Sequence, residues 1–507
     1  MSYKHGYCIN SGNCSVADKQ EMVHIQEGQA FICPECRIGM HLKVESIPAT
    51  NSAKLAGIVL GLLASSLGLF WFLSAAPASA AKTAAPELEK PSAMLRFAGS
   101  NTIGSELLPA LAEAYMKQQG ISEVKRIPGA SSEEIHLVDV KNPSPETTIQ
   151  IAAHGSSTAF SALSEKKADI GMSSRKIKIG EISKLALLGD MTAPSKEQVL
   201  ALDGIAVIVN RSNAVSALTK DQIAAIFSGV ITDWSELKRS PGKIKLYARD
   251  DKSGTYDTFK SIVLDNLRLS DDAKRFEDSV MLSDKVAADP DGIGFVGLPF
   301  VKGARALAVS DTGTAPLIAN RLTVATEDYP LARRLYLYTP DKKNNPHVRK
   351  FAEFALSKAG QEIVKQYGFI ELNVQSSKVA AKSDAPDDYT RLTAGAERLS
   401  LNFRFKPGSH SLDNKGVRDL ERVIEFVENA KATNKSIMLF GFSDTVGDTT
   451  INVKLSRDRA KAVADELTRR GVTLASVSGY GASLPVASNL TKEGREINRR
   501  VEVWVKQ

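Results

Sequence analysis

The longest hydrophobic stretch of the chain runs over residues 55–76 and contains no charged side chain. As a helix that rises 1.5 Å per residue it would be about 33 Å long, enough to cross the hydrocarbon core of a membrane. The other apolar stretches are shorter and are interrupted by charges or turn residues. We therefore predict one transmembrane helix. The alternative is a signal peptide cleaved near Ala78-Ser79-Ala80, although a signal peptide normally begins the chain and 54 residues precede this stretch.

Beyond this stretch the hydrophobic pattern divides the chain into two folded regions, each preceded by a polar linker. Residues 93–375, after a linker at 77–92, alternate between strand-like and amphipathic helix-like segments, which is typical of α/β layers. Residues 395–507, after a linker at 376–394, repeat the alternation on a smaller scale. There we expect a βαβαβ order, with elements at 399–405, 414–429, 436–442, 455–470 and 500–505. The predicted fold class is α/β multidomain.

Composition limits the partners of the chain. Its 507 residues are 43% hydrophobic and 24% charged, as in ordinary folded proteins, and this length requires two or three globular units. The net charge is +7, but Lys and Arg are interspersed with Asp and Glu, and no basic run carries interleaved aromatic residues. We therefore expect no nucleic-acid partner. The excess of cations also fits an anionic ligand or an anionic wall polymer.

All four cysteines lie before the hydrophobic stretch, as Cys8-x5-Cys14 and Cys33-x2-Cys36. Two such pairs can hold one tetrahedral Zn²⁺, which would supply much of the folding energy of residues 1–45, because that segment has few apolar residues. The segment resembles the four-cysteine zinc ribbons of bacterial N-termini, which implies structural Zn²⁺ as a cofactor. The alternative is a pair of disulfides, and the substitute metal ligands are His5, His24 and His41.

The distribution of thiols also predicts the orientation of the membrane helix. Cysteines before residues 55–76 and none after them place the N-terminus in the reducing cytosol and the rest of the chain outside it. Arg37, Lys43 and Lys54 before the helix agree with this orientation. Gly57-x3-Gly61 within the helix allows two copies to pack as a homodimer, although this spacing is common by chance.

Three segments of the region 93–375 place Ser, Thr and Gly at the beginning of a predicted helix: 98–104, 154–158 and 249–255. Free backbone N–H groups at a helix start, hydroxyl groups and a nearby arginine together bind a tetrahedral oxyanion. Each segment alone is also explained by ordinary helix capping. The coincidence of three such segments with Arg249 favours an oxyanion site.

The same segments resemble the PstS-like family of phosphate-binding receptors of ABC transporters. The resemblance covers nearly all of 93–375 and rests on GSNT, GSS…ADIGMSSR, VLALDGIAVIVNRSN, IFSGVITDWSEL, R-x3-SGT and GIGFVG. It implies a two-lobed periplasmic-binding-protein fold of type II, with hinge strands near 200–209 and 333–338, after which 347–372 return to the first lobe. It implies that Asp251 orients Arg249 by pairing with it. The phosphate-binding residues that it implies are Ser100, Thr102, Ile103, Ser156, Ser174, Arg175, Arg249, Asp251, Ser253, Gly254 and Thr255.

One position departs from this family pattern. Ser174 stands where many phosphate receptors carry an acceptor Asp, which favours a ligand that still bears a proton and so separates phosphate from sulfate. A serine hydroxyl either accepts or donates a hydrogen bond, so it enforces that choice less strongly. The next residue, Arg175, either adds positive charge to the site or is an exposed residue of the lobe.

Two other motifs point to different chemistry but lack their context. Gly292-x-Gly294-x-x-Gly297 has the spacing of a dinucleotide fingerprint, but Leu-Pro follows it where a helix should begin. Asp251-Lys-Ser-Gly-Thr255 is similar to the D-K-x-G-T motif of aspartyl-phosphate hydrolases, in which the Asp is a covalent nucleophile. That reaction requires an acidic Mg²⁺ motif downstream, and only Asp289 and Asp291 are near. We therefore predict that the protein is not an enzyme.

The second region, 395–507, resembles the OmpA-like peptidoglycan-binding domain. The resemblance covers FSDTVG from Phe442 to Gly447 and the terminal Asn498-Arg-Arg-Val-Glu502. Between them it includes Asn452, Leu455-Ser456 and Arg459-Ala460. Diaminopimelate in peptidoglycan carries an ammonium and a carboxylate, which Asp444 and Arg459 would bind respectively. The peptidoglycan-binding residues that the resemblance implies are Asp444, Thr445, Gly447, Asn452 and Arg459.

Together these patterns predict a bacterial inner-membrane protein with one span, a cytoplasmic zinc ribbon and two periplasmic domains. The expected function is binding of phosphate or a related oxyanion, for uptake or sensing, by a receptor tethered non-covalently to peptidoglycan. Its further partner would be an ABC permease or a cytoplasmic signalling protein. The alternatives are a structural envelope linker whose receptor domain has lost its ligand, and the phosphohydrolase.

Overall fold

The computed structural model describes residues 93–506 except 238–240, 252, 342–344, 381–383, 407–408, 410 and 430–435, together with three strands nearer the N-terminus. These strands, β1 (Tyr3–Cys8), β2 (Met22–Gln26) and β3 (Met40–Leu42), form an antiparallel sheet in the order β2-β1-β3. They belong to one compact unit, Met1–Lys90, and the rest of the chain forms a second, Pro91–Gln507.

Several predictions fall outside what is described. The transmembrane helix at 55–76, the linker at 77–92 and three of the four cysteines lie among the remaining residues, and the side chain of Cys8 is not described. Within the described residues no helix has the length and apolar character needed to cross a membrane, and no cluster of His, Cys, Asp and Glu side chains is arranged to hold a metal ion. The zinc ribbon and the membrane helix therefore stay predictions.

A long mixed sheet runs through residues 93–375 in the order β12-β11-β13-β9-β17-β8-β4-β7-β6-β5. The first lobe contains the strands β4 (Leu95–Gly99), β5 (Val124–Pro128), β6 (Glu134–Asp139), β7 (Thr148–Ala152) and β8 (Ile170–Ser173). Apolar side chains alternate between its two faces. Phe97 packs with the helices α4 (Leu107–Gln118), α11 (His347–Leu356) and α12 (Lys358–Gln366), whereas Ala98 packs with α5 (Ser156–Ser164). The return of 347–372 to the first lobe is thereby confirmed.

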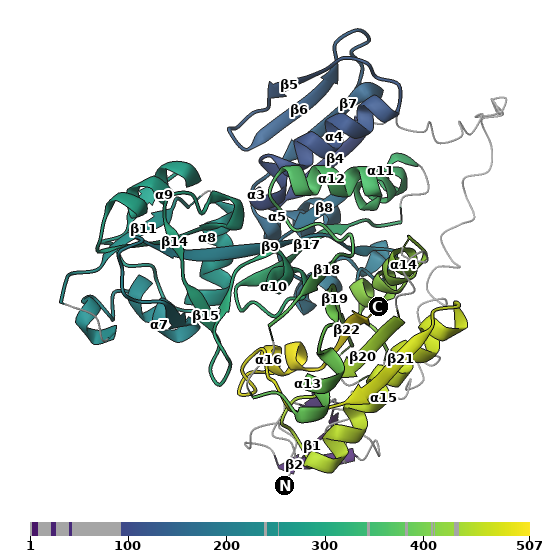
Figure 1. Ribbon diagram of the computed structural model, residues 1–507. Helices are drawn as coiled ribbons and strands as arrows, with labels where there is room; N and C mark the ends of the chain where they lie inside the picture. Colours follow the sequence, from purple (N-terminus) through teal and green to yellow (C-terminus); the bar gives the residue numbers. More distant parts are fainter. Residues whose placement is uncertain are drawn as a thin grey trace, which may run out of the picture. The chain divides into compact units, whose positions relative to one another are not determined.

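The second lobe lies on the other side of the long central strands (Figure 1). Its strands are β11 (Lys245–Arg249), β12 (Lys274–Phe276) and β13 (Gly292–Gly297), and its helices are α7 (Lys220–Phe227), α8 (Gly254–Phe259) and α9 (Ser279–Ala288). Phe259 and Phe295 stack at a ring-centroid distance of 3.9 Å in its core. The sequence GIGFVG is strand β13, followed by the 3₁₀ turn η5 (Leu298–Phe300), so it does not open a helix as a dinucleotide fingerprint would.

Shorter elements complete the two lobes. A small sheet in the order β10-β15-β16 contains β10 (Ala217–Thr219), β15 (Ala308–Ser310) and β16 (Leu317–Ile318), and β14 (Arg305–Ala306) pairs with β9. The remaining short helices are α6 (Ile179–Lys184), α10 (Arg321–Ala325), η1 (Pro145–Thr147), η2 (Ala186–Leu188), η3 (Trp234–Leu237) and the π-helix η4 (Lys260–Leu264).

Two strands connect the lobes, as the sequence predicted. β9 (Glu197–Val209) is buried along its whole length and pairs antiparallel with β17 (Ala332–Tyr338), from Tyr338 opposite Glu197 to Ala332 opposite Gly204. β9 continues into the second lobe by pairing with β13, and β17 pairs with β8 of the first. The two hinge strands therefore lie side by side, and any movement of one lobe against the other passes through them.

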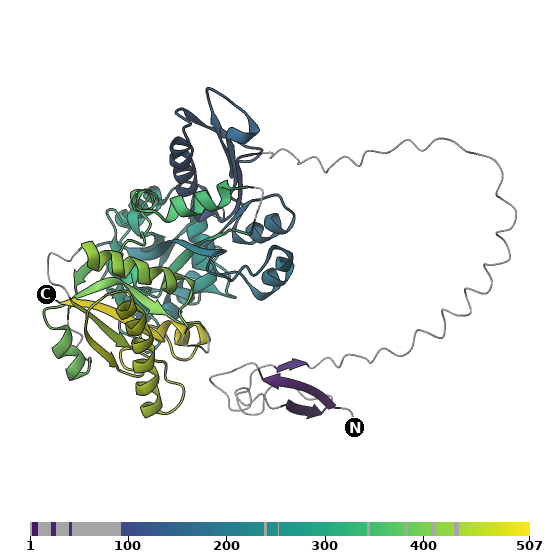
Figure 2. The same ribbon diagram turned by 90° about the vertical axis from the view of Figure 1, so that its right-hand side faces the viewer.

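The C-terminal domain has a five-stranded sheet in the order β18-β19-β22-β20-β21 (Figure 2). The predicted strands and helices are present as β19 (Glu397–Arg404), α14 (Asn414–Asn429), β20 (Ser436–Gly441), α15 (Thr449–Arg469) and β22 (Arg500–Lys506). Two elements were not predicted: β21 (Leu474–Gly479), which pairs parallel with β20, and α16 (Lys492–Asn498).

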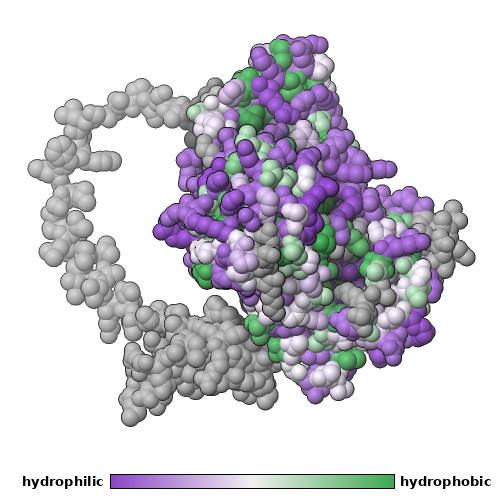
Figure 3. Space-filling model, turned by 60° about the vertical axis from the view of Figure 1, so that its left-hand side comes forward, coloured by the Kyte–Doolittle hydropathy of each residue, from purple (hydrophilic) through white to green (hydrophobic). Residues whose placement is uncertain are grey.

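The face of the protein seen in Figure 3 is largely hydrophilic, with hydrophobic residues in small groups.

The segment 376–394, predicted as a polar linker with little periodicity, contains regular structure. This segment contains β18 (Ser376–Lys378), which pairs with β19, and α13 (Asp387–Thr393). Tyr389 of α13 is buried, with its ring 5.4 Å from that of Phe440 and 5.9 Å from that of Trp504, and its hydroxyl donates to Glu502 at 2.8 Å. The polar composition of the segment conceals this single anchoring side chain.

We therefore expect Tyr389→Ala to lower the free energy of unfolding by about 3–5 kcal/mol, because it leaves a cavity among aromatic rings. The half-exposed Tyr367 provides the control, since Tyr367→Ala should change stability by at most about 1 kcal/mol. Denaturant unfolding followed by near-ultraviolet circular dichroism measures both. Equal, small effects would mean that α13 does not belong to the C-terminal core.

Candidate functional site

The three predicted helix starts exist, and two of them lie at one edge of the sheet. α3 (Asn101–Gly104) follows β4, α5 follows β7, and α8 follows β11. Because β4 and β7 are neighbouring parallel strands, their carboxyl ends place Ser100 and Ser156 close together. The N–H of Gly155 donates to the carbonyl of Gly99 at 2.8 Å and joins the two loops. The first lobe thus presents two helix starts side by side.

The third helix start, from the second lobe, directly contacts the first. A Cβ atom added at Gly254 would lie 1.9 Å from Oγ1 and 2.4 Å from the backbone nitrogen of Thr102. No side chain larger than hydrogen fits there unless the lobes separate. The structure therefore has the two lobes closed on each other at the starts of α3 and α8.

A buried arginine of hinge strand β17 joins the lobes at the same point. Nη2 of Arg333 donates to Oγ1 of Thr102 at 2.7 Å and to the carbonyl of Gly254 at 3.0 Å. The same group forms an ion pair with Asp203 of β9 at 3.0 Å. Burial lowers the pKa of Arg333, and Asp203 opposes that shift. Since arginine keeps its proton in proteins, a guanidinium paired with the carboxylate of Asp203 is fixed between the lobes.

Arg333 was not among the site residues predicted from the sequence, although it begins a predicted hinge strand. In the sequence around Arg333, the only sign of a functional role is a pair of arginines at the start of an otherwise apolar strand. Which of them faces the other lobe depends on the register of β17 against β9, and no local pattern reveals that register.

The serines of the first lobe form a hydroxyl cluster. Oγ of Ser156 lies 3.0 Å from Oγ of Ser174 and accepts a hydrogen bond from the backbone N–H of Ser174 at 3.0 Å. Both residues are buried, and so is Ser100, whose Oγ has no hydrogen-bond partner among the described residues. Ile103, at the start of the same helix, is fully buried. Hydroxyl groups of this kind can donate to an oxyanion.

The two cations expected in the site are already held by neighbours. Arg175 binds Glu181 through two hydrogen bonds, of 2.9 and 2.7 Å, and lies over the ring of Phe160. Arg249 donates to the carbonyls of Phe276 and Glu277 at 3.2 and 2.7 Å, and to the hydroxyl of Ser279. Burial lowers the pKa of Arg249. These contacts direct both guanidinium groups to their own lobes.

The expected pairing of Asp251 with Arg249 was wrong. Asp251 is exposed and binds Arg275 at 2.9 Å. Arg275 belongs to β12, the parallel neighbour of β11, so it reaches the loop after β11 more easily than Arg249 does. In the same loop Ser253 is buried and caps α8 by accepting from the N–H of Tyr256 at 3.3 Å, while Thr255 is half-buried.

An open cleft of about 1500 Å³ lies beside these groups. From the two lobes it is lined by Ser156, Ser174, Arg175, Asp251, Ser253 and Arg333, among others. The C-terminal domain contributes part of its wall, including Lys406, Asn414 and Lys492. The cleft thus combines hydroxyl donors and a fixed guanidinium, which is the chemistry that recognises an oxyanion.

A second constellation lies in the loop after β20. Asp444 is 7% exposed, forms an ion pair with Arg499 at 2.5 Å, and accepts from the N–H of Val446 at 2.9 Å. Asn452 donates to the carbonyl of Val446 at 3.0 Å, so it shapes this loop from within. Gly447 has a φ of +92°, a left-handed conformation that favours glycine.

Near this loop lies a buried arginine whose positive charge is only partly balanced by neighbouring groups. Arg459 is 8% exposed, and its Nε has no hydrogen-bond partner among the described residues. Burial, together with repulsion from Arg499, lowers the pKa of Arg459 to about 10 despite the attraction of Asp444. Asp444, Arg459 and Arg499 therefore form a group that can receive an ammonium and a carboxylate together. Arg499 was not predicted as part of it, although it lies in the quoted motif at 498–502.

Both folded regions match families of known proteins. Residues 76–359 match the model of the PBP superfamily domain, and residues 404–499 match that of the OmpA family. The phosphate-binding protein PstS of Pseudomonas aeruginosa is 30% identical over 297 residues, which cover 54% of this chain and 90% of that protein. Protein SphX of Synechococcus elongatus is 28% identical over 316 residues, 59% of this chain and 90% of that protein.

The solved structures with similarity include an ABC-type phosphate transport receptor from Vibrio cholerae. It is 23% identical, the match covers 54% of this chain and 99% of that one, and the TM-score is 0.43. The superfamily model spans more than half of the chain, and PstS of P. aeruginosa is matched over nine tenths of its length. The chain therefore belongs to the PstS family of the PBP superfamily and carries in addition a C-terminal domain of the OmpA family.

Proposed function

We propose that residues 93–375 bind inorganic phosphate, or a closely related oxyanion, between the two lobes, for uptake or sensing. The observation that carries the proposal is the convergence of Thr102, Gly254 and Arg333, which brings helix starts from both lobes to one fixed guanidinium. The relatives named as phosphate-binding proteins support it. The hydroxyl groups of Ser100, Ser156 and Ser174 would donate to the ligand oxygens.

We propose further that the C-terminal domain binds the diaminopimelate of peptidoglycan. Asp444 would receive the ammonium. Arg459 would bind the carboxylate, which would accept a hydrogen bond from the buried Nε that has no partner among the described residues. Thr445, Gly447 and Asn452 would hold the loop. With the predicted membrane helix at 55–76 and the zinc ribbon at 1–45, the protein would be a cell-envelope receptor that is anchored at the inner membrane and tethered to the wall. An ABC permease would receive the bound oxyanion from the receptor, or a cytoplasmic signalling protein would respond to its binding.

The first prediction from this proposal concerns closure of the two lobes. Gly254→Ala should weaken phosphate binding at least tenfold, because the new methyl group would collide with Thr102 whenever the lobes close. Gly180→Ala is the matched control, since nothing lies within 4 Å of its Cβ position. Isothermal titration with phosphate measures both variants. Unchanged affinity in Gly254→Ala would contradict binding between these helix starts.

Selectivity gives the second prediction. With Ser174 in place of an acceptor carboxylate, the unmodified protein should bind sulfate within about tenfold of phosphate, and Ser174→Asp should reduce sulfate affinity more than phosphate affinity. The reason is that a buried carboxylate repels a fully ionised ligand and accepts a hydrogen bond from a protonated one. Parallel titrations with the two anions test this. If neither anion binds the unmodified protein, the structural-linker alternative is favoured.

The third prediction concerns the wall. Asp444→Asn and Arg459→Met should each abolish co-sedimentation with purified peptidoglycan. Arg459→Met should leave the melting temperature unchanged or raised, because it removes a poorly compensated buried charge. The exposed Arg470 supplies the control, Arg470→Ala, which should sediment as before. Retained sedimentation in both site variants would refute the assigned roles.

A further inference from the structure

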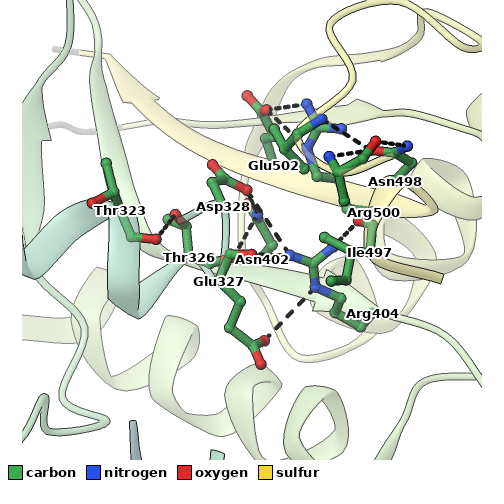
Figure 4. A network of polar contacts seen from close by, with 12 residues as sticks. Thr323, Thr326, Glu327, Asp328, Asn402, Arg404, Ile497, Asn498, Arg500 and Glu502 are labelled. Carbon is green, nitrogen blue, oxygen red and sulfur yellow. Dashed lines mark hydrogen bonds and ion pairs between the residues drawn. The ribbon is translucent and has the colours of Figure 1, made fainter. Parts of the chain in front are cut away.

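The C-terminal domain packs against the receptor domain at the turn before hinge strand β17. This turn, Thr326–Asp328, joins α10 to the hinge, and residues of β19 contact it (Figure 4). We call these contacts the hinge interface. It comprises Thr326, Glu327 and Asp328 from the receptor domain and Arg398, Asn402 and Arg404 from β19.

Three side chains of β19 bind polar groups of the turn. Asn402 donates to the carbonyl of Thr326 and to the carboxylate of Asp328, both at 2.9 Å. Arg398 forms an ion pair with Asp328 at 2.7 Å. Arg404 donates to the carbonyls of Thr326 and Glu327 at 3.0 and 3.2 Å, and on its other side to the carbonyl of Ile497.

Further contacts reach both lobes. Asn414 of α14 donates to the carbonyl of Thr192 and to Glu197, at 2.8 and 3.0 Å, on the side of the first lobe. The N–H of Ser488 donates to Asp311 of the second lobe at 2.9 Å. Between them, Asp413 forms an ion pair with Arg334 of β17 at 2.6 Å. The C-terminal domain is thus attached on both sides of the hinge as well as at the hinge.

Burial makes these contacts selective for one arrangement. Asp328, Arg398 and Arg404 are each 4–7% exposed at the side chain, so losing a partner would weaken the compensation of a buried charge. Burial alone would raise the pKa of Glu327, but Arg334 outweighs burial and lowers the pKa to about 2. Glu327 therefore stays ionised at neutral pH. Together with the contacts to Thr192, Glu197 and Asp311, the hinge interface holds the C-terminal domain against both lobes in the arrangement that the structure has.

That arrangement is the closed one. In the same structure Thr102 of the first lobe contacts Gly254 of the second, and Arg333 binds both. Arg333 is the neighbour of Arg334 in β17, so one strand holds the closed cleft and the interface with the C-terminal domain. The loop that contains Asp444 and Thr445 also lies close to the second lobe. Asn489 accepts a hydrogen bond from the N–H of Thr445, and the adjacent Ser488 contacts Asp311.

We propose that docking of the C-terminal domain across the hinge stabilises the closed receptor and so couples the state of this domain to oxyanion affinity. The inference rests on the proposed phosphate-binding function. Lobe closure is the two-state element, and both the oxyanion and the docked domain favour its closed state. Linkage requires the effect to be reciprocal, so the oxyanion must strengthen docking by the factor by which docking strengthens oxyanion binding.

The test removes both members of one interdomain ion pair. Their other charged partners keep a partner of their own, because Glu502 still pairs with Arg500 and Arg404 still pairs with Glu327. Asp328→Ala with Arg398→Ala should weaken inorganic phosphate binding about tenfold and speed its release, measured on the full chain in detergent by titration and stopped flow. Neither residue lines the oxyanion cleft. The matched control is Glu421→Ala with Arg470→Ala, an exposed pair within the C-terminal domain, which should bind phosphate as the unmodified chain does.

Two further measurements separate the outcomes. Asn402→Ala should act in the same direction as the double variant, and peptidoglycan co-sedimentation of both variants verifies that the C-terminal domain is folded. Folded variants with unchanged phosphate affinity and release would overturn the coupling while leaving the proposed function intact. If the unmodified chain does not bind phosphate, the proposed function falls and the coupling falls with it.

Discussion

Two consecutive arginines in one hinge strand determine how the rest of the molecule is assembled. Successive side chains of a strand point to opposite faces, so Arg333 and Arg334 of β17 cannot serve the same partner. Arg333 binds Asp203 and the two helix starts, and Arg334 binds Glu327 and Asp413. A strand that connects two lobes therefore also connects the oxyanion cleft with a separate domain. A change of register by one residue would turn each guanidinium to the opposite face of the strand.

Buried charge explains why these domains have a defined arrangement. Charged groups inside a protein are costly unless they are paired and hydrogen-bonded, so a network of them stabilises less than apolar packing of the same size. Its value lies in specificity, because a slightly different docking leaves charges without partners. An apolar contact would tolerate sliding. The hinge interface, with its ion pairs and its carbonyl groups bound by Arg404 and Asn402, does not.

Much of the fold was predictable because the relevant signals are local. The helix starts and the main elements of the C-terminal domain follow from hydrophobic pattern and short motifs, and the resemblance to phosphate receptors implied the two hinge strands. What failed depends on neighbours distant in sequence. Asp251 pairs with Arg275 because β12 lies next to β11, and Arg333 enters the site through its register with β9. Tyr389 was missed because one buried ring in a polar segment produces no periodicity.

The ion pair between Asp444 and Arg499 has a consequence for how the protein would hold the wall. The carboxylate that would receive the ammonium of the polymer is already occupied by a cation from its own chain. Attachment is then an exchange of one cation for another, because Asp444 must release Arg499 before it can receive the ammonium of the polymer. Such a contact forms and breaks readily, so the tether would be able to move between the repeating units of the polymer.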